Sequence, residues 1–129
     1  MAVITTLNGQ DIDINENAIV LIAGPFPHDV GPHTYIYGVT PGALITGEPA
    51  DALVTRLGIN PPLAVLTRPD SSPVWIKSSA VTSIRAPVAT EQQGPGEVNA
   101  VLQVGSLHQA VHEDVATARS IIDAQGGSV

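Results

Sequence analysis

A repeat that covers much of the chain restricts the possible folds more than any other feature of the sequence. Residues 66–84 (LTRPDSSPVWIKSSAVTSI) align without a gap to residues 4–22 (ITTLNGQDIDINENAIVLI). Apolar positions are kept between the two copies, as where Ile76 falls on Ile14, while the polar positions between them differ. Positions that face a core keep their character in this way. The sequence therefore predicts two copies of one small structural unit.

The first predicted unit, residues 1–59, is expected to consist of short strands and one helix. Asn8-Gly9 indicates a tight hairpin turn, because both residues accept positive φ. Strands are expected at residues 3–7, 10–14, 18–23, 34–39 and 43–46. A helix should follow and end at Gly58, because apolar residues recur at the spacing of one buried helical face, at Ala50, Leu53, Val54 and Leu57.

The second predicted unit, residues 60–129, follows the same course. Glu113 and Asp114 are placed to open its helix, where negative charge is favourable. Strands are expected at residues 63–67, 73–77, 79–85, 98–104 and 107–111. The buried face of the helix should contain Val115, Ala118 and Ile122, and Gly126-Gly127 should end it.

The predicted fold class is α+β, mostly β, with two ββ-β-loop-ββ-α units that are small and barrel- or sandwich-like. The 11 prolines and 12 glycines favour many turns and short elements. With one Trp, one Phe and two Tyr, the core must be built from Val, Ile, Leu and Ala. Units of this size are marginal alone, so we expect them to pack as one body with approximate two-fold symmetry.

Several of these residues resemble the FlbD-like family of small bacterial and phage proteins. Its pattern is an "LTxxNGxxxxIN" hairpin, an isoleucine strand, and a "VxES" step into a short helix. The matching positions are Asn8-Gly9, Ile14-Asn15 and Glu48 in the first unit and Leu66-Thr67, Ile76, Val111 and Glu113 in the second. The resemblance implies a tandem form of this unit. It also implies a regulatory role through contact with a transcription factor, as in the flagellar members.

Composition excludes several classes of function. The net charge is −7, with only five Lys and Arg residues, so the chain has no basic surface for nucleic acid or for an anionic membrane. There is no cysteine, which removes disulfides, thiol catalysis and Cys-based zinc sites. The first ten residues, MAVITTLNGQ, have no basic segment and no cleavable apolar core. A cytoplasmic protein, or one assembled in a cytoplasm, is expected.

No arrangement of residues in the sequence is typical of catalysis. His108 and His112 are four apart, which on a helix could share a metal, but the stretch is predicted to be a strand that enters a helix. Asp11 and Asp13 share a strand face and alternate with isoleucines, as on an exposed face. We therefore expect no enzyme, catalytic residue, metal or cofactor. A metal-dependent hydrolase is the alternative, and in it His108→Ala would abolish activity.

The candidate interface lies in two Pro/Gly-bearing loops, residues 24–33 and 86–97, and on the second hairpin. Trp75 could anchor an interface or pack under a neighbouring loop. We expect a non-enzymatic structural protein, in its most concrete form a phage capsid cement (decoration) protein on the virion surface. Its partners would be further copies of itself, as a homo-oligomer, and a major capsid protein. The candidate interface residues are Phe26, Pro27, His28, His33, Trp75, Pro87 and Pro95.

Overall fold

The structure is a computed structural model of the whole chain. It describes residues 2–24, 33–40, 42–59, 63–69, 72–87, 98–105 and 107–125. The chain divides into two compact units, Met1–Pro62 and Leu63–Val129. The boundary lies slightly later in the chain than the one the repeat suggests, which falls between residues 59 and 60.

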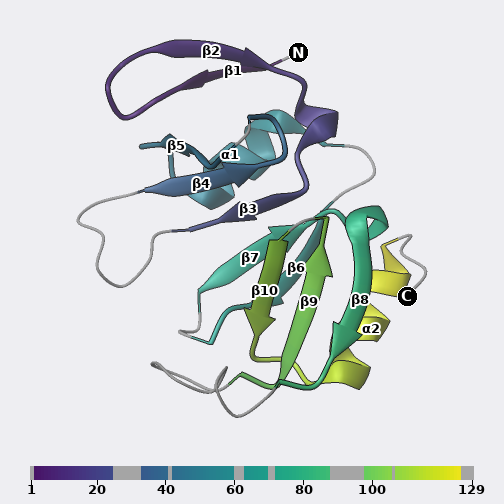
Figure 1. Cartoon of the computed structure of the whole chain (residues 1–129). Helices are drawn as coiled ribbons and strands as arrows, with labels where there is room; N and C mark the ends of the chain where they lie inside the picture. The colour runs from purple at the N-terminus through teal and green to yellow at the C-terminus, as the bar shows by residue number, and fades with distance from the viewer. Residues whose placement is uncertain are drawn as a thin grey trace. The chain divides into compact units, whose positions relative to one another are not determined.

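The first unit is built from two groups of antiparallel strands and one helix (Figure 1). Strands β1 and β2 form a hairpin, and β3, β4 and β5 are neighbours in that order. A 3₁₀ helix, η1, connects β2 to β3. The bounds are β1 Ala2–Thr5, β2 Asp11–Ile14, η1 Glu16–Ala18, β3 Leu21–Ala23, β4 Thr34–Tyr37, β5 Leu44–Thr46 and α1 Ala50–Leu57.

The second unit contains the same elements in the same order. Strands β6 and β7 form a hairpin, and β8, β9 and β10 are antiparallel neighbours with β9 in the middle (Figure 1). The fold is therefore α+β and mostly β, as the sequence predicts, and the described strands form open sheets and no closed barrel. The bounds are β6 Ala64–Thr67, β7 Pro73–Ile76, η2 Ser78–Ala80, β8 Val81–Arg85, β9 Ala100–Val104, β10 Leu107–Val111 and α2 Val115–Ala124.

The apolar positions of the repeat form the cores. Ile4 and its equivalent Leu66 are almost completely buried, and so are Ile14 and its equivalent Ile76. These side chains point to the inner face of each hairpin, because residues along a strand alternate between its two faces. Burying each of them stabilises the fold by roughly 1.5–3 kcal/mol.

The turn of the first hairpin differs from the prediction. β1 ends at Thr5, and the turn itself is Leu7-Asn8-Gly9, closed by a hydrogen bond of 2.9 Å from the Gly9 N–H to the Thr6 carbonyl. Gly9 has φ +84°. A three-residue loop with glycine at its last position makes a G1 bulge, so Leu7 leaves the strand in which the sequence placed it.

The two 3₁₀ helices were also not predicted as such. The sequence places strands at residues 18–23 and 79–85, but the first residues of each form the end of η1 and η2. In the first unit the Asn15 side chain accepts a hydrogen bond of 3.1 Å from the Asn17 N–H. This local contact competes with strand pairing, so the strand begins only at Leu21.

Both helices bury most of the faces that the sequence predicts, but Val54 on α1 and Val115 on α2 are only half-buried. Ala50, Leu53 and Leu57 are buried on α1, and Gly58 ends that helix in the left-handed conformation, as expected. On α2 the buried residues are Ala118 and Ile122. α2 ends at Ala124, and Gln125 is its C-cap. Gly126-Gly127, which the sequence placed at the end of this helix, lie outside the described residues.

Candidate interaction site

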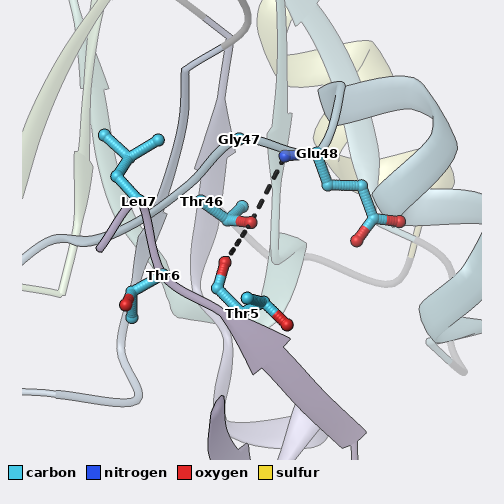
Figure 2. A pocket seen from close by; sticks show the side chains of 6 residues that line it. All are labelled: Thr5, Thr6, Leu7, Thr46, Gly47 and Glu48. Atoms are coloured by element: carbon cyan, nitrogen blue, oxygen red, sulfur yellow. Dashed lines mark hydrogen bonds between the residues drawn. The ribbon is translucent and has the colours of Figure 1, made fainter. Parts of the chain in front are cut away.

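An open recess lies in the first unit, between the tip of hairpin β1–β2 and strand β5. One part has a volume of about 270 Å³ and is lined by the six residues of Figure 2: Thr5, Thr6, Leu7, Thr46, Gly47 and Glu48. An adjoining part, about 370 Å³, shares Thr6 and Leu7 and is also lined by Asn8, Gln10, Ala43, Leu44 and Ile45. We refer to the two parts together as the β5 recess.

The β5 recess exists because the hairpin and β5 meet at one point and then separate. That point is a bridge between Thr6 and Thr46. Thr46, which is buried, donates its hydroxyl to the Thr5 carbonyl at 2.8 Å and accepts the Glu48 N–H at 3.3 Å (Figure 2). Beyond the bridge the chain turns at Leu7, whose side chain is 52% exposed at the edge of the recess.

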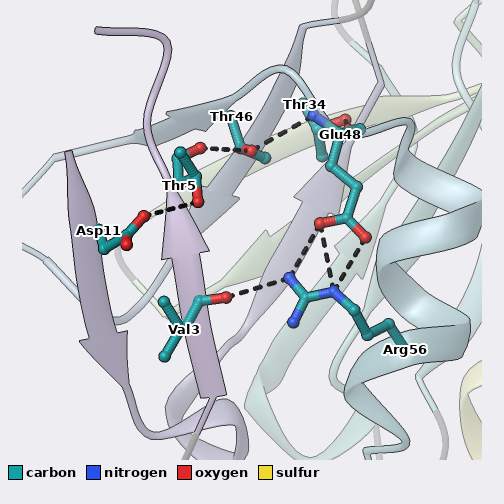
Figure 3. Close-up of polar contacts among 7 residues, drawn as sticks. All are labelled: Val3, Thr5, Asp11, Thr34, Thr46, Glu48 and Arg56. Atoms are coloured by element: carbon teal, nitrogen blue, oxygen red, sulfur yellow. Dashed lines mark hydrogen bonds and ion pairs between the residues drawn. The ribbon is translucent and has the colours of Figure 1, made fainter. Parts of the chain in front are cut away.

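A charged network closes the other side of this junction. The Arg56 guanidinium on α1 contacts the Glu48 carboxylate at 2.9–3.3 Å and donates to the Val3 carbonyl at 3.1 Å (Figure 3). The hydrogen bond with Glu48 raises the pKa of Arg56 above its usual value. Arg56 thereby covers a carbonyl on the outer edge of β1, and Glu48 carries no unpaired charge into the β5 recess.

The equivalent junction in the second unit uses the same glutamate position differently. Both Glu113 carboxylate oxygens accept the Thr67 N–H, at 2.9 and 3.0 Å. The His112 N–H donates to the Thr67 carbonyl at 2.7 Å. Both backbone polar groups of Thr67, at the end of β6, are therefore bound by the segment between β10 and α2. In the first unit, Glu48 binds Arg56 instead.

The two hairpins expose apolar side chains at equivalent positions. Val3 on β1 is 46% exposed, and Val65 on β6 is 50% exposed. Across the strands, Val3 lies opposite Asp13 and Val65 lies opposite Trp75. Together with Leu7 these two valines are the exposed large apolar residues of the described part of the chain, so its exposed large apolar residues gather on the hairpins.

The lining of the β5 recess combines hydrogen-bonding groups with apolar side chains. Its lining consists of hydroxyls, apolar side chains and amides, with Glu48 already paired to Arg56. The first part, about 270 Å³, is below the roughly 300–1,000 Å³ that small-molecule sites occupy, and the second, about 370 Å³, is near the lower limit. Within the described residues, no group of three or more His, Asp or Glu side chains could hold a metal ion. The recess therefore offers hydrogen-bonding groups and apolar side chains, and its one carboxylate is already paired.

The candidate interface residues are only partly described. His33 precedes β4, Trp75 lies in β7 and Pro87 follows β8, and all three are partly buried. They lie on different parts of the chain, His33 in the first unit and the other two in the second. The remaining four candidates, Phe26, Pro27, His28 and Pro95, lie outside the described residues.

Sequence reasoning missed Leu7, Thr46 and Glu48 as a site. Leu7 was assigned to a strand, and the meeting of Thr6 with Thr46 joins positions far apart in sequence. The repeat did contain a signal for the exposed valines, because Val3 and Val65 are aligned with each other. Across the strands they lie opposite Asp13 and Trp75, which are also aligned with each other.

Comparison with known proteins adds no family to this description: no protein-family model, curated protein or solved structure matches the chain. In the part of the chain that the structure describes, neither helix has the length and apolar character needed to cross a membrane.

Proposed function

We propose that the protein is a non-enzymatic structural protein that binds a repeating protein lattice, most concretely a cement (decoration) protein of a phage capsid. The observation that supports this function is the duplicated hairpin face. Val3 and Val65 occupy equivalent positions in the two units and are both about half exposed. In this proposal the protein lies on the virion surface, and its partners are the major capsid protein and neighbouring copies of itself.

Two similar contact points on one chain suit a target that repeats. When two binding points are linked, the second binds at a high effective concentration, and avidity can exceed either single affinity by roughly 10²–10⁴-fold. A contact as small as one valine with its cross-strand neighbour binds weakly alone. The net charge of −7 keeps the free protein soluble and favours a neutral or basic target surface.

Quantitative mass spectrometry of purified phage particles tests this function. A cement protein should be present in many copies, in a fixed ratio to the capsid subunit. When it is released from the particles, its measured mass should equal that of the native chain. Absence from particles would contradict the proposal.

A FlbD-like regulatory protein is the second candidate, and the contact between Thr67 and Glu113 favours it. Both residues match the pattern of that family, and the glutamate binds the threonine backbone at 2.9 and 3.0 Å. This candidate predicts that affinity purification from the same lysate enriches one soluble transcription factor, and that particles contain none of the protein.

A further inference from the structure

We propose that the β5 recess binds an extended, uncharged segment of the partner protein, which adds as a strand beside β5. This inference rests on the proposed function, because it names the surface and the kind of segment that the lattice protein would supply. It concerns a different surface from the outer hairpin faces that display Val3 and Val65.

The first argument is the state of the β5 edge. β5 is the terminal strand of its sheet and pairs with β4 through three residue pairs. On its other side, the described residues pair with it only at the bridge between Thr6 and Thr46. Alternate residues of an antiparallel strand direct N–H and C=O groups away from the neighbouring strand. An edge of this kind is a template for another strand.

The second argument is the contrast with β1, whose outer edge is covered. There the Val3 carbonyl accepts from Arg56 at 3.1 Å, and the Thr5 carbonyl accepts from Thr46 at 2.8 Å (Figure 3). The structure thus protects the edge of β1 with side chains, while Ala43, Leu44 and Ile45 of the neighbouring edge line an open recess.

The third argument concerns the chemistry of the occupant. The part of the recess beside β5 is lined by uncharged side chains, and Glu48 in the other part is paired with Arg56. A charged side chain buried there would lose its hydration without gaining an ionic partner. Leu7 and Ile45 instead offer apolar contact, so the segment should be uncharged and carry apolar side chains.

Co-sedimentation with purified phage particles tests the inference, with wild-type protein, Leu7→Asp and the control Ala52→Asp. Ala52 is exposed on α1, outside the lining of the recess, so the control adds the same charge elsewhere. We expect Leu7→Asp to bind at least about tenfold more weakly and the control to bind like wild type. Hydrogen exchange should also show slower exchange of the Ile45 amide in the particle-bound protein.

The other outcomes separate this inference from the proposed function. If wild type binds particles and Leu7→Asp binds equally well, with no change at the Ile45 amide, the recess inference is wrong and the lattice function stands. If wild type does not bind particles, the proposed function fails and the inference with it. If the Ile45 amide becomes protected at high protein concentration without particles, the occupant is a second copy, which also overturns the inference.

Discussion

At the scale of single residues, backbone geometry at two glycines has different consequences. Gly38 has φ +110°, and a Cβ there would lie 2.5 Å from the Ala18 carbonyl oxygen and 2.9 Å from the Val20 nitrogen. Gly9 also has a positive φ, +84°, but a Cβ there would meet nothing within 4 Å. Glycine is therefore required at position 38 because neighbouring backbone leaves no room for a side chain as well as because φ is positive. At position 9 the positive φ of the turn is the only reason for glycine.

We predict that Gly38→Ala lowers the free energy of unfolding by roughly 2–4 kcal/mol, because the cost of a strained φ adds to the cost of displacing the neighbouring backbone. Gly9→Ala is the matched control and should lose only about 1–2 kcal/mol. Urea unfolding followed by circular dichroism measures both. Equal midpoints for the two variants would show that the contact with Ala18 is not rigid.

Single residues also show where sequence reasoning ends. The burial of Ile4, Ile14, Leu66 and Ile76 was predictable, because an alignment of the chain with itself identifies positions that must stay apolar. The role of Glu48 could not be predicted, because local sequence does not show that Arg56 contacts both Glu48 and the Val3 carbonyl.

At the scale of elements, the two glutamates at equivalent positions have different structural roles. Glu113 holds the end of β6 to the segment before α2, whereas Glu48 holds α1 to β1 through Arg56. We predict that Glu113→Ala destabilises the protein by about 1–3 kcal/mol, because the partly buried Thr67 N–H loses its acceptor. Hydrogen exchange of the Thr67 amide should become faster.

Glu48→Ala serves as the comparison for this prediction. Its ion pair with Arg56 is partly exposed, with 44% and 29% of the Arg56 and Glu48 side chains accessible, so the loss should be below about 1 kcal/mol. Glu113→Gln keeps one carbonyl oxygen and should fall between wild type and Glu113→Ala. An unchanged Thr67 exchange rate in Glu113→Ala would contradict the assigned role.

The start of α2 should respond to pH. The Asp114 carboxylate accepts the Thr117 N–H at 2.8 Å, and this hydrogen bond lowers the pKa of Asp114 below its usual value. A lowered folded-state pKa contributes stability that is present above the unfolded pKa and is lost as pH falls through the folded value.

We therefore predict that the melting temperature of Asp114→Asn, which keeps a capping oxygen, falls less than that of wild type as pH is lowered through the acid range. Asp114→Ala should lower stability at neutral pH as well. Thermal unfolding of the three proteins across the acid range measures this. If the Asn variant follows the wild-type profile throughout, Asp114 is not responsible for the acid dependence.

Elements were predicted with uneven success. Self-similarity and apolar spacing fixed their order and both helix faces, since those depend on local periodicity. The beginnings of β3 and β8 were placed too early, because η1 and η2 compete locally with strand pairing. The β5 recess depends on Thr6 meeting Thr46 across 40 residues of sequence, and no local pattern marks that contact.

At the scale of the whole molecule, the proposed function gives one chain a reason to carry the same unit twice. Each unit displays a half-exposed valine on the outer face of its first hairpin, Val3 in one and Val65 in the other. Two weak contacts on one chain bind a repeating surface more tightly than either contact alone. Duplication would then supply avidity without a large interface.

The measurement that tests this claim most directly is particle binding by wild type, Val3→Lys, Val65→Lys and the double variant. Lysine at these exposed strand positions should change folding stability by no more than about 0.5 kcal/mol, and Val3→Lys faces Asp13. We predict that each single variant weakens binding by roughly 10²-fold or more, and that the double variant does not bind. Wild-type binding by both single variants would contradict the claim that the two hairpins act together.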